Sequence, residues 1–304
     1  MSAIAIISFS IFLIALLSLI RKEADLFSPA RLFTLVWSFA IGLTELKLSR
    51  LQFNWNGYSW FILLLCISSV FLGMFIVYVL NINNNLKTVA TIRDSVAKIK
   101  INSDVFFKLI VVMFSAYLIS YIAIYLIVGF IPLFTATPNI ARLKWSVFGF
   151  GLIIHLAPAA IYLIFVFYLL VKAELGKKSI LSVLLLVTLL SFLLLLQRFG
   201  LVISIILTLI YAYYGTFKFR PRNLIVVFVL VAIFMYGIST LRVSSFFVEF
   251  FYYTSKMKFS HDYAFLSEPY MYVAMNLENF ANAVNKLERF TYGYFTFDFI
   301  LALS

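Results

Sequence analysis

The sequence predicts an all-α fold: a polytopic helical integral membrane protein with about eight transmembrane helices, the start of a ninth and an outer amphipathic helix. Hydrophobic residues make up 64% of the 304 residues, charged residues make up 12%, and the mean hydropathy is +1.07. The hydrophobic residues form unbroken runs of about 18 to 24, the length that a helix needs to cross a bilayer. A transmembrane barrel instead requires alternating strands of about ten residues.

The longest apolar run, Ser179 to Phe217, is the first one to be divided into membrane spans. Its only strongly polar side chains are Gln197 and Arg198. A single helix of this length, at about 1.5 Å per residue, would be nearly twice as long as a hydrocarbon core of about 30 Å is thick. We therefore predict two spans joined by a turn at Gln197–Gly200. A guanidinium at mid-span costs about 2.5–3.5 kcal/mol, so we expect Arg198 at a membrane face.

Six other apolar stretches predict spans. In chain order they are about Ser2–Ile20, Leu32–Leu48, Trp60–Leu80, Val105–Val128, Val147–Val171 and Asn223–Thr240. The polar stretch between the third and fourth spans is expected to hold a short amphipathic turn. The fifth span contains His155 and Pro158. We expect the histidine to hydrogen-bond inside the bundle, near a carbonyl that the proline frees.

The distribution of basic residues predicts the orientation. Counting Lys108 at the start of the fourth span and Lys47 at the end of the second, the connections after the first, third, fifth and seventh spans carry fourteen Lys and Arg residues, whereas the other three carry five. By the positive-inside rule the first set is cytoplasmic and the N-terminus is periplasmic. The net charge of +12 therefore reflects topology, and no nucleic-acid partner is expected. Three arginines fall at the outer face: Arg142, Arg198 and Arg242. The positive-inside rule does not account for basic residues on that side.

After Arg242 the sequence is less uniformly apolar, and this change defines the predicted domain boundaries. Residues 1–241 are expected to form the transmembrane bundle, 242–291 a periplasmic loop, and 292–304 the start of an incomplete span, as if the protein were truncated at its C-terminus. Within the loop, Ser267-Glu268-Pro269 is typical of a helix start. One apolar stripe then follows at Val273, Leu277, Phe280, Val284 and Leu287. This pattern predicts an amphipathic helix.

Three arginines at one membrane face indicate a multiply anionic ligand. The planar guanidinium pairs bidentately with phosphate and stays charged at any accessible pH. The alternative for Arg142 and Arg242 is snorkelling to the interface. For Arg198 a functional role is favoured, because its hairpin is too short to need a charge. His261 and Glu268 are the acid/base candidates on this side, with a surface helix cap or an ion pair as the alternative.

Several other kinds of chemistry have no signal in the sequence. Cys66 is the single cysteine, so neither a disulfide framework nor a cysteine-based metal site is expected. No histidine or carboxylate spacing is typical of metal ligands, and no phosphate-binding glycine loop or dinucleotide fingerprint occurs. We therefore expect no cofactor. The near absence of acidic residues within the predicted spans argues against an ion-coupled transporter.

Several short segments together resemble a known family. They are Ile131-Pro132-Leu133-Phe134 followed by Arg142, the span ending in Gln197-Arg198, Arg242 closing the next span, and the outer-loop segments Glu268-Pro269-Tyr270 and Asn276-Leu277-Glu278-Asn279. In order and spacing these resemble the bacterial oligosaccharide repeat-unit polymerases, the Wzy-type O-antigen polymerases. The resemblance covers most of the chain from the fourth span onward.

The resemblance implies an enzyme of the bacterial inner membrane. Such a glycosyltransferase polymerises undecaprenyl-pyrophosphate-linked oligosaccharide repeat units into O-antigen or capsule-type polysaccharide at the periplasmic face, without a nucleotide-sugar donor or a metal. Arg142, Arg198 and Arg242 would bind the pyrophosphate, and Glu268 or His261 would be the catalytic base. The expected partners are the lipid-linked oligosaccharide and membrane lipids, and a chain-length regulator protein is a further candidate.

Three other functions remain open from the sequence. An O-antigen ligase usually carries a catalytic histidine in a large outer loop, whereas His261 lies in a modest one. A flippase or exporter of lipid-linked oligosaccharide predicts charges lining a central cavity and an internal two-fold repeat, which the sequence lacks. In a purely structural membrane subunit the three outer arginines would have no role.

Overall fold

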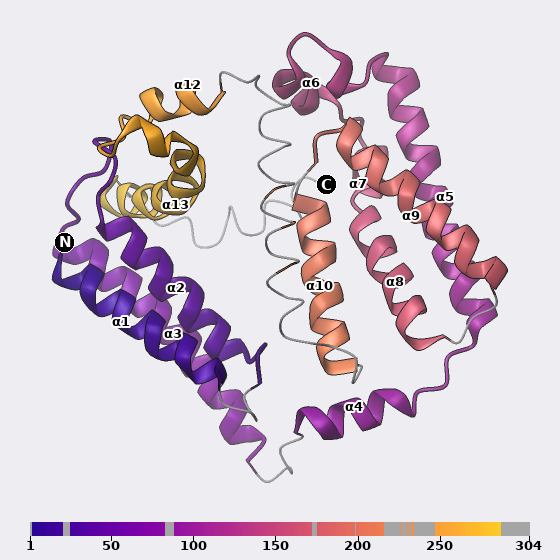
Figure 1. Ribbon diagram of the computed structural model, residues 1–304, viewed down its shortest axis with the longest axis horizontal. Coiled ribbons are helices and arrows are strands. Elements are labelled where there is room, and N and C mark those ends of the chain that lie inside the picture. The colour runs from indigo at the N-terminus through magenta and orange to yellow at the C-terminus, as the bar shows by residue number, and fades with distance from the viewer. Residues whose placement is uncertain are drawn as a thin grey trace. The chain divides into compact units, whose positions relative to one another are not determined.

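The computed structural model describes residues 2–20, 25–82, 88–171, 175–197, 199–215 and 247–286, together with positions 226, 230 and 233. Regular structure among these residues is helical, apart from an isolated bridge between Ser49 and Met257. The predicted all-α class is therefore confirmed (Figure 1). The chain divides into unit 1, which joins Met1–Leu86 to Val248–Ser304, and unit 2, Lys87–Phe247.

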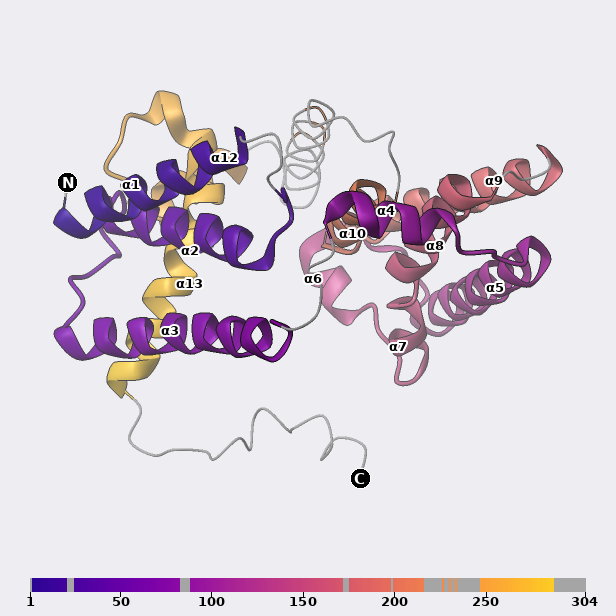
Figure 2. The same cartoon turned by 90° about the horizontal axis from the view of Figure 1, so that it is seen from below.

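Unit 1 contains three apolar helices and an amphipathic helix that crosses one of their ends. Its elements are α1 (Ala3–Leu17), a 3-10 turn (Ser18–Ile20), α2 (Pro29–Glu45), α3 (Gly57–Leu80), α12 (Phe247–Thr254), η3 (His261–Leu266) and α13 (Ser267–Lys286). The helices α1 and α2 pack closely, because Gly42 leaves room for the ring of Phe9, 3.0 Å from where a Cβ would lie. Helix α13 runs across both α2 and α3 (Figure 2).

Side-chain caps fix where the helices of unit 1 begin. The Ser2 hydroxyl accepts a hydrogen bond from the Ala5 N–H (3.1 Å), and the Asn56 side chain accepts one from the Ser59 N–H (2.8 Å). Each cap satisfies a backbone donor that the first helical turn leaves without an intrahelical acceptor. The Ser2 hydroxyl also donates to Glu45 (2.8 Å), which ties the start of α1 to the end of α2.

Helix α13 begins at Ser267, as the sequence predicts, and it is long enough to reach both α2 and α3. Leu277, from the predicted apolar stripe, is buried with Trp55 and Leu63. The other buried positions are Ser267, Tyr270, Met271, Ala274, Glu278 and Ala281. The buried face of α13 is therefore wider than the predicted stripe, and it includes a glutamate.

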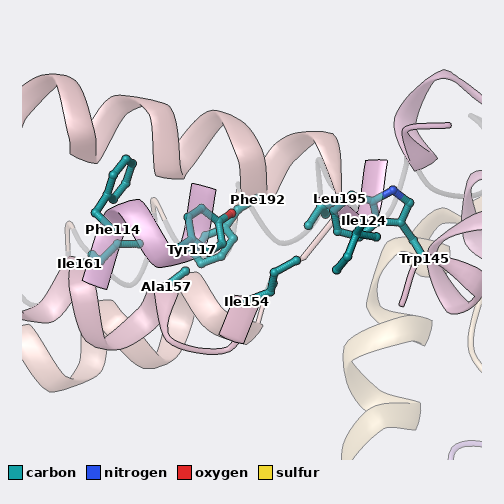
Figure 3. Close-up of a cluster of buried hydrophobic side chains, with 9 residues drawn as sticks. All are labelled: Phe114, Tyr117, Ile124, Trp145, Ile154, Ala157, Ile161, Phe192 and Leu195. Carbon is teal, nitrogen blue, oxygen red and sulfur yellow. The ribbon is translucent and has the colours of Figure 1, made fainter. Parts of the chain in front are cut away.

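Unit 2 packs its helices around an aromatic core. Its elements are α4 (Val89–Ala97), α5 (Ser103–Val128), η2 (Pro132–Phe134), α6 (Pro138–Lys144), α7 (Phe150–Ile154), α8 (Ala157–Leu170), α9 (Leu175–Leu194) and α10 (Phe199–Gly215). The short helix α4 matches the expected amphipathic turn. Phe114 and Tyr117 of α5 pack against Phe192 of α9 and Ile161 of α8 (Figure 3).

The long apolar run breaks into two helices, as predicted. Helix α9 ends at Leu194, and Leu196 adopts a left-handed backbone conformation with φ of 54°. The Gln197 N–H donates to the Phe192 carbonyl (2.9 Å), which closes the turn before α10 begins at Phe199. Arg198 itself lies outside the described residues.

The predicted fifth span is broken into α7 and α8. Pro158 has no N–H to donate to the carbonyl of Ile154, the last residue of α7, so the helix cannot continue regularly through this point. His155 lies exposed at this break. The expectation that His155 is hydrogen-bonded inside the bundle is therefore wrong, because its side chain is exposed.

Four helical stretches among the described residues are long and apolar enough to cross a membrane: Gly57–Leu80, Ser103–Phe134, Phe150–Leu170 and Leu175–Leu194. Ala3–Leu17 and Gly200–Gly215 are shorter apolar helices. The predicted span Asn223–Thr240 falls almost entirely outside the described residues, and 292–304 does so completely. The helices are compatible with a membrane-embedded protein, and the number of about eight spans stays a prediction.

Candidate functional site

The five site residues that the sequence predicts are spread over the chain. Arg198 and Arg242 lie outside the described residues. Arg142 belongs to unit 2, whereas His261 and Glu268 belong to unit 1. The grouping of three arginines and a base around one pyrophosphate therefore stays a prediction.

The position of Arg142 is set by the segment that links α5 to α6. Helix α5 ends at Val128 and is capped by Gly129, whose φ of 78° lies in the left-handed region that glycine adopts without strain. Helix α6 begins at Pro138, a residue suited to a first helical turn. The Trp145 indole N–H, directly after α6, donates to the carbonyl of Phe130 (2.8 Å). This bond ties the end of α6, which carries Arg142, back to the end of α5.

The guanidinium of Arg142 is incompletely satisfied. The residue is partly buried, and its Nε is buried with no hydrogen-bond partner. The three ion pairs among the described residues involve other side chains. A buried donor without an acceptor costs about 1–3 kcal/mol, and more when the group is charged. An anionic oxygen of a ligand would remove that cost.

A second unsatisfied polar atom lies close to Trp145. The Tyr121 hydroxyl of α5 is buried without a hydrogen-bond partner, and the Tyr121 and Trp145 ring centroids are 4.9 Å apart. Only four buried side-chain polar atoms in the described part of the chain lack a partner, and two of them belong to residues that contact Trp145: Tyr121 through its ring, and Arg142 through its carbonyl, which accepts from the Trp145 N–H (3.3 Å). We call Arg142, Tyr121 and Trp145 the Arg142 site. Such atoms are rare in folded proteins, and a bound ligand is one physical explanation.

In unit 1, the two predicted acid/base residues lie near the start of α13: His261 in η3, just before it, and Glu268 in its first turn. His261 is exposed, and its ring stacks on Tyr253 at 5.8 Å and meets Tyr252 edge-on at 5.3 Å. Glu268 is partly buried in the first turn of α13, where the helix dipole favours a negative charge. Of the two predicted acid/base residues, His261 is therefore the more exposed.

The structure also shows a buried charge centre that the sequence analysis did not identify. Glu278 is completely buried. Its Oε1 accepts hydrogen bonds from Lys47 Nζ (2.9 Å) and Gln52 Nε2 (3.2 Å), and its Oε2 accepts one from the Trp55 indole N–H (3.0 Å). Both carboxylate oxygens thus have donors, so the burial of this charge is compensated.

The same centre extends through Gln52 to Tyr270. The Tyr270 hydroxyl donates to Gln52 Oε1 (2.6 Å) and accepts from the Leu48 N–H (2.9 Å). Burial raises the pKa of Tyr270 above its ordinary value of 10.0, although these two hydrogen bonds oppose the shift. Lys47 also pairs with Glu45 (3.3 Å). These bonds attach the α2–α3 connection firmly to α13.

Glu278 is therefore a structural connection and not an accessible base. A sequence signal for its burial does exist. Met271, Ala274, Glu278 and Ala281 recur at spacings of three, four and three, so Glu278 interrupts a second apolar stripe beside the predicted one. A charge within such a stripe requires partners from elsewhere in the fold.

The chain was compared with protein-family models, curated proteins and solved structures. No family model, no curated protein and no solved structure matches this chain. The function is therefore inferred from the residues and their geometry.

Proposed function

We propose that this chain is an inner-membrane glycosyltransferase that polymerises undecaprenyl-pyrophosphate-linked oligosaccharide repeat units at the periplasmic face. The observation that supports this proposal is the unpartnered, buried Nε of Arg142, which lies just beyond the end of a helix long enough to cross a membrane. Guanidinium groups bind phosphate oxygens with charge-assisted hydrogen bonds.

The proposed reaction joins a growing chain to a newly delivered repeat unit. The acceptor hydroxyl oxygen attacks the anomeric carbon at the end of the growing chain, and the bond from that carbon to the pyrophosphate oxygen breaks. The bonding electron pair leaves with the lipid pyrophosphate. Arg142 stabilises this negative charge, and Arg198 and Arg242 are predicted to share that role. Glu268 or His261 accepts the proton of the acceptor hydroxyl.

The proposed orientation is tested by cysteine labelling in whole cells. After Cys66 is replaced by serine, a single cysteine is introduced at Lys144 or at Lys177. A membrane-impermeant thiol reagent is expected to label the first position from the periplasm and not the second. Labelling with the reverse preference would place Arg142 at the cytoplasmic face and contradict the proposal.

The proposed chemistry is tested with Arg142→Gln, and Lys144→Gln is the matched control. Both residues lie on α6, and Lys144 is exposed. In cells producing the full-length protein, Arg142→Gln should reduce polymerisation by about 100-fold or more, as expected when a donor to a developing anion is removed. The Lys144→Gln variant should keep long polysaccharide chains.

The product pattern separates the candidate functions. Loss of a polymerase leaves single repeat units transferred to lipid A. Loss of a ligase leaves long chains on the lipid carrier, and loss of a flippase leaves single units on the cytoplasmic face. Normal chain lengths in an Arg142→Gln strain with normal protein abundance would contradict the proposed role of Arg142.

A further inference from the structure

A long apolar groove runs along the α1–α2 pair. Its deeper part is a cavity of about 430 Å³, lined by Ile4 to Ile11 on α1, Phe33 to Ile41 on α2 and Trp60 to Phe71 on α3. On each helix the side chains that line it recur at spacings of one, three and four residues, so each helix contributes one continuous face. The cavity is therefore a feature of helix packing within unit 1.

Helix α3 covers this cavity between two aromatic contacts. At the end near α13, Trp60 packs against Trp55, with the ring centroids 4.7 Å apart. Further along, Phe33 of α2 and Phe71 of α3 meet edge to face at 5.4 Å. The covered stretch from Trp60 to Phe71 is about 16 Å long at 1.5 Å per residue.

The groove continues beyond the covered part. A second, more open hollow of about 350 Å³ shares Ile11 and Thr34 with the first and extends to Ser18, directly after α1, and to Arg31 on α2. From Ile4 to Ser18 the combined groove is about 21 Å long, which is about two thirds of a hydrocarbon core of about 30 Å. An elongated apolar chain fits such a shape.

The chemistry of the groove differs along its length. In the covered part, the hydroxyls of Thr34 and Ser38 donate to backbone carbonyls of their own helix at 2.8 and 2.6 Å, so they need no polar partner in the groove. At the open end Arg31 donates to the backbone oxygen of Asp25, which holds its guanidinium at the mouth. A guanidinium carries five N–H donors, so this bond leaves donors for an anionic group.

We propose that this groove binds a single anionic membrane lipid. Its phosphate pairs with Arg31, and one hydrocarbon chain follows the α1–α2 seam beneath α3. The cavity of 430 Å³ is about three times as large as the apolar cavity of about 150 Å³ that admits benzene. The proposal goes beyond the proposed function, and its test measures bound lipid instead of polysaccharide.

Filling the groove tests the binding of the hydrocarbon chain. Ser8 is buried and lines the cavity, whereas Ser10, two residues later on α1, is exposed and does not line it. The full chain is purified from membranes in mild detergent, and retained lipid is quantified by native mass spectrometry. Ser8→Phe should lose the retained lipid, and Ser10→Phe should keep it. Equal retention in the two variants would overturn the proposal.

Removing the charge tests the headgroup contact. Arg31→Gln is compared with Arg50→Gln, which changes an exposed arginine outside the groove. The proteins are reconstituted in vesicles of phosphatidylglycerol and phosphatidylethanolamine and then repurified. Wild type and Arg50→Gln should retain phosphatidylglycerol preferentially, and Arg31→Gln should lose that preference. An unchanged preference in Arg31→Gln would exclude the proposed headgroup site.

A crosslinking measurement keeps the proposal testable if Ser8→Phe does not fold. A benzophenone amino acid is placed at Ile67, which lines the cavity, or at Leu65, which is exposed on another face of α3. Irradiation of the detergent-purified full chain should give a lipid adduct at Ile67 and little at Leu65. A peptide adduct at Ile67, or equal lipid adducts at both positions, would show that the groove does not hold a lipid chain.

Discussion

Unit 1 contains a completely buried charged side chain and unit 2 a partly buried one, and their hydrogen-bonding groups are satisfied very differently. Glu278 in unit 1 is completely buried and accepts hydrogen bonds from three side chains. Arg142 in unit 2 is partly buried, and its Nε has no partner. A buried charge with a full set of partners holds elements together, whereas a buried donor without one is costly unless a ligand supplies the acceptor.

This difference assigns separate roles to the two charges. The Glu278 centre joins the α2–α3 connection to α13, and neither of its carboxylate oxygens lacks a donor. The Arg142 site is held by the Trp145–Phe130 hydrogen bond, so its geometry does not depend on the guanidinium itself. Substitutions at the first centre should therefore lower stability, and under the proposed function substitutions at the second should lower activity.

The largest expected effect is that of Glu278→Ala. Lys47, Gln52 and Trp55 would lose their shared acceptor, and removing one partner of a buried ion pair costs about 3–5 kcal/mol of unfolding free energy. Thermal unfolding of the purified protein in detergent measures this loss. Asn279→Ala, an exposed neighbour on α13, is the control and should stay within about 0.5 kcal/mol of wild type. Equal effects of the two changes would contradict a structural role for Glu278.

A smaller effect is expected for Trp55→Phe. This change removes the indole N–H that donates to Glu278 Oε2 at 3.0 Å and keeps an aromatic ring in place. Hydrogen bonds to charged groups contribute about 1.5–3 kcal/mol. The comparison is Trp60→Phe at the adjacent ring, which leaves every donor to Glu278 intact. A larger loss of unfolding free energy in Trp60→Phe would show that ring packing, and not the hydrogen bond, stabilises this centre.

Tyr270 should make the stability of unit 1 depend on alkaline pH. Because burial raises its pKa in the folded protein, the neutral phenol is favoured by folding. Its contribution is complete below the ordinary pKa of 10.0 and is lost as the pH rises through the higher folded value. Tyr270→Phe should cost about 0.5–1.5 kcal/mol at neutral pH, by removing the hydroxyl that donates to Gln52.

Denaturation at a series of pH values from neutral to above 10 measures this dependence. Many other tyrosines titrate in the same range, so the informative quantity is the difference between wild type and Tyr270→Phe. That difference should shrink as the pH rises. Tyr263→Phe, which changes an exposed tyrosine just before α13, should leave the wild-type profile unchanged. A constant difference between wild type and Tyr270→Phe would contradict the raised pKa.

The smallest expected loss of stability is that of Arg142→Gln. Because the Arg142 Nε donates no hydrogen bond within the protein, the change should lower the unfolding free energy by no more than about 0.5 kcal/mol, and removal of the unpartnered buried donor should act in the opposite, stabilising direction. Thermal unfolding of the ligand-free protein in detergent is the measurement. A loss comparable to that of Glu278→Ala would show that Arg142 has a structural role, and the contrast between the two units would disappear.

The predictions of helix ends that rest on residues close together in the sequence agree best with the structure. The break between α9 and α10 follows from two polar residues and a glycine in a long apolar run, and the start of α13 follows from Ser267 and Pro269. The break after Ile154 was missed, although Pro158 could have indicated it, because hydropathy alone continues through that point. Local chemistry therefore predicted helix ends better than helix continuity.

The candidate site was predictable only in part. The position of Arg142 after the fourth predicted span identified it as a residue without a topological explanation, but the missing partner of its Nε required the packed structure. Glu278 was overlooked as a site because its partners are distant: Lys47 precedes it by 231 residues and Trp55 by 223. No short-range pattern indicates such pairs.

The sequence by itself determined the all-α class, the apolar helices and most of their ends, because hydropathy, caps and proline act within a few residues. Only the tertiary structure decided which charges are satisfied. That depends on segments far apart in the chain that meet when α13 packs against α2 and α3. The same packing forms the groove beneath α3, because a cavity belongs to the space between helices and to no single one of them.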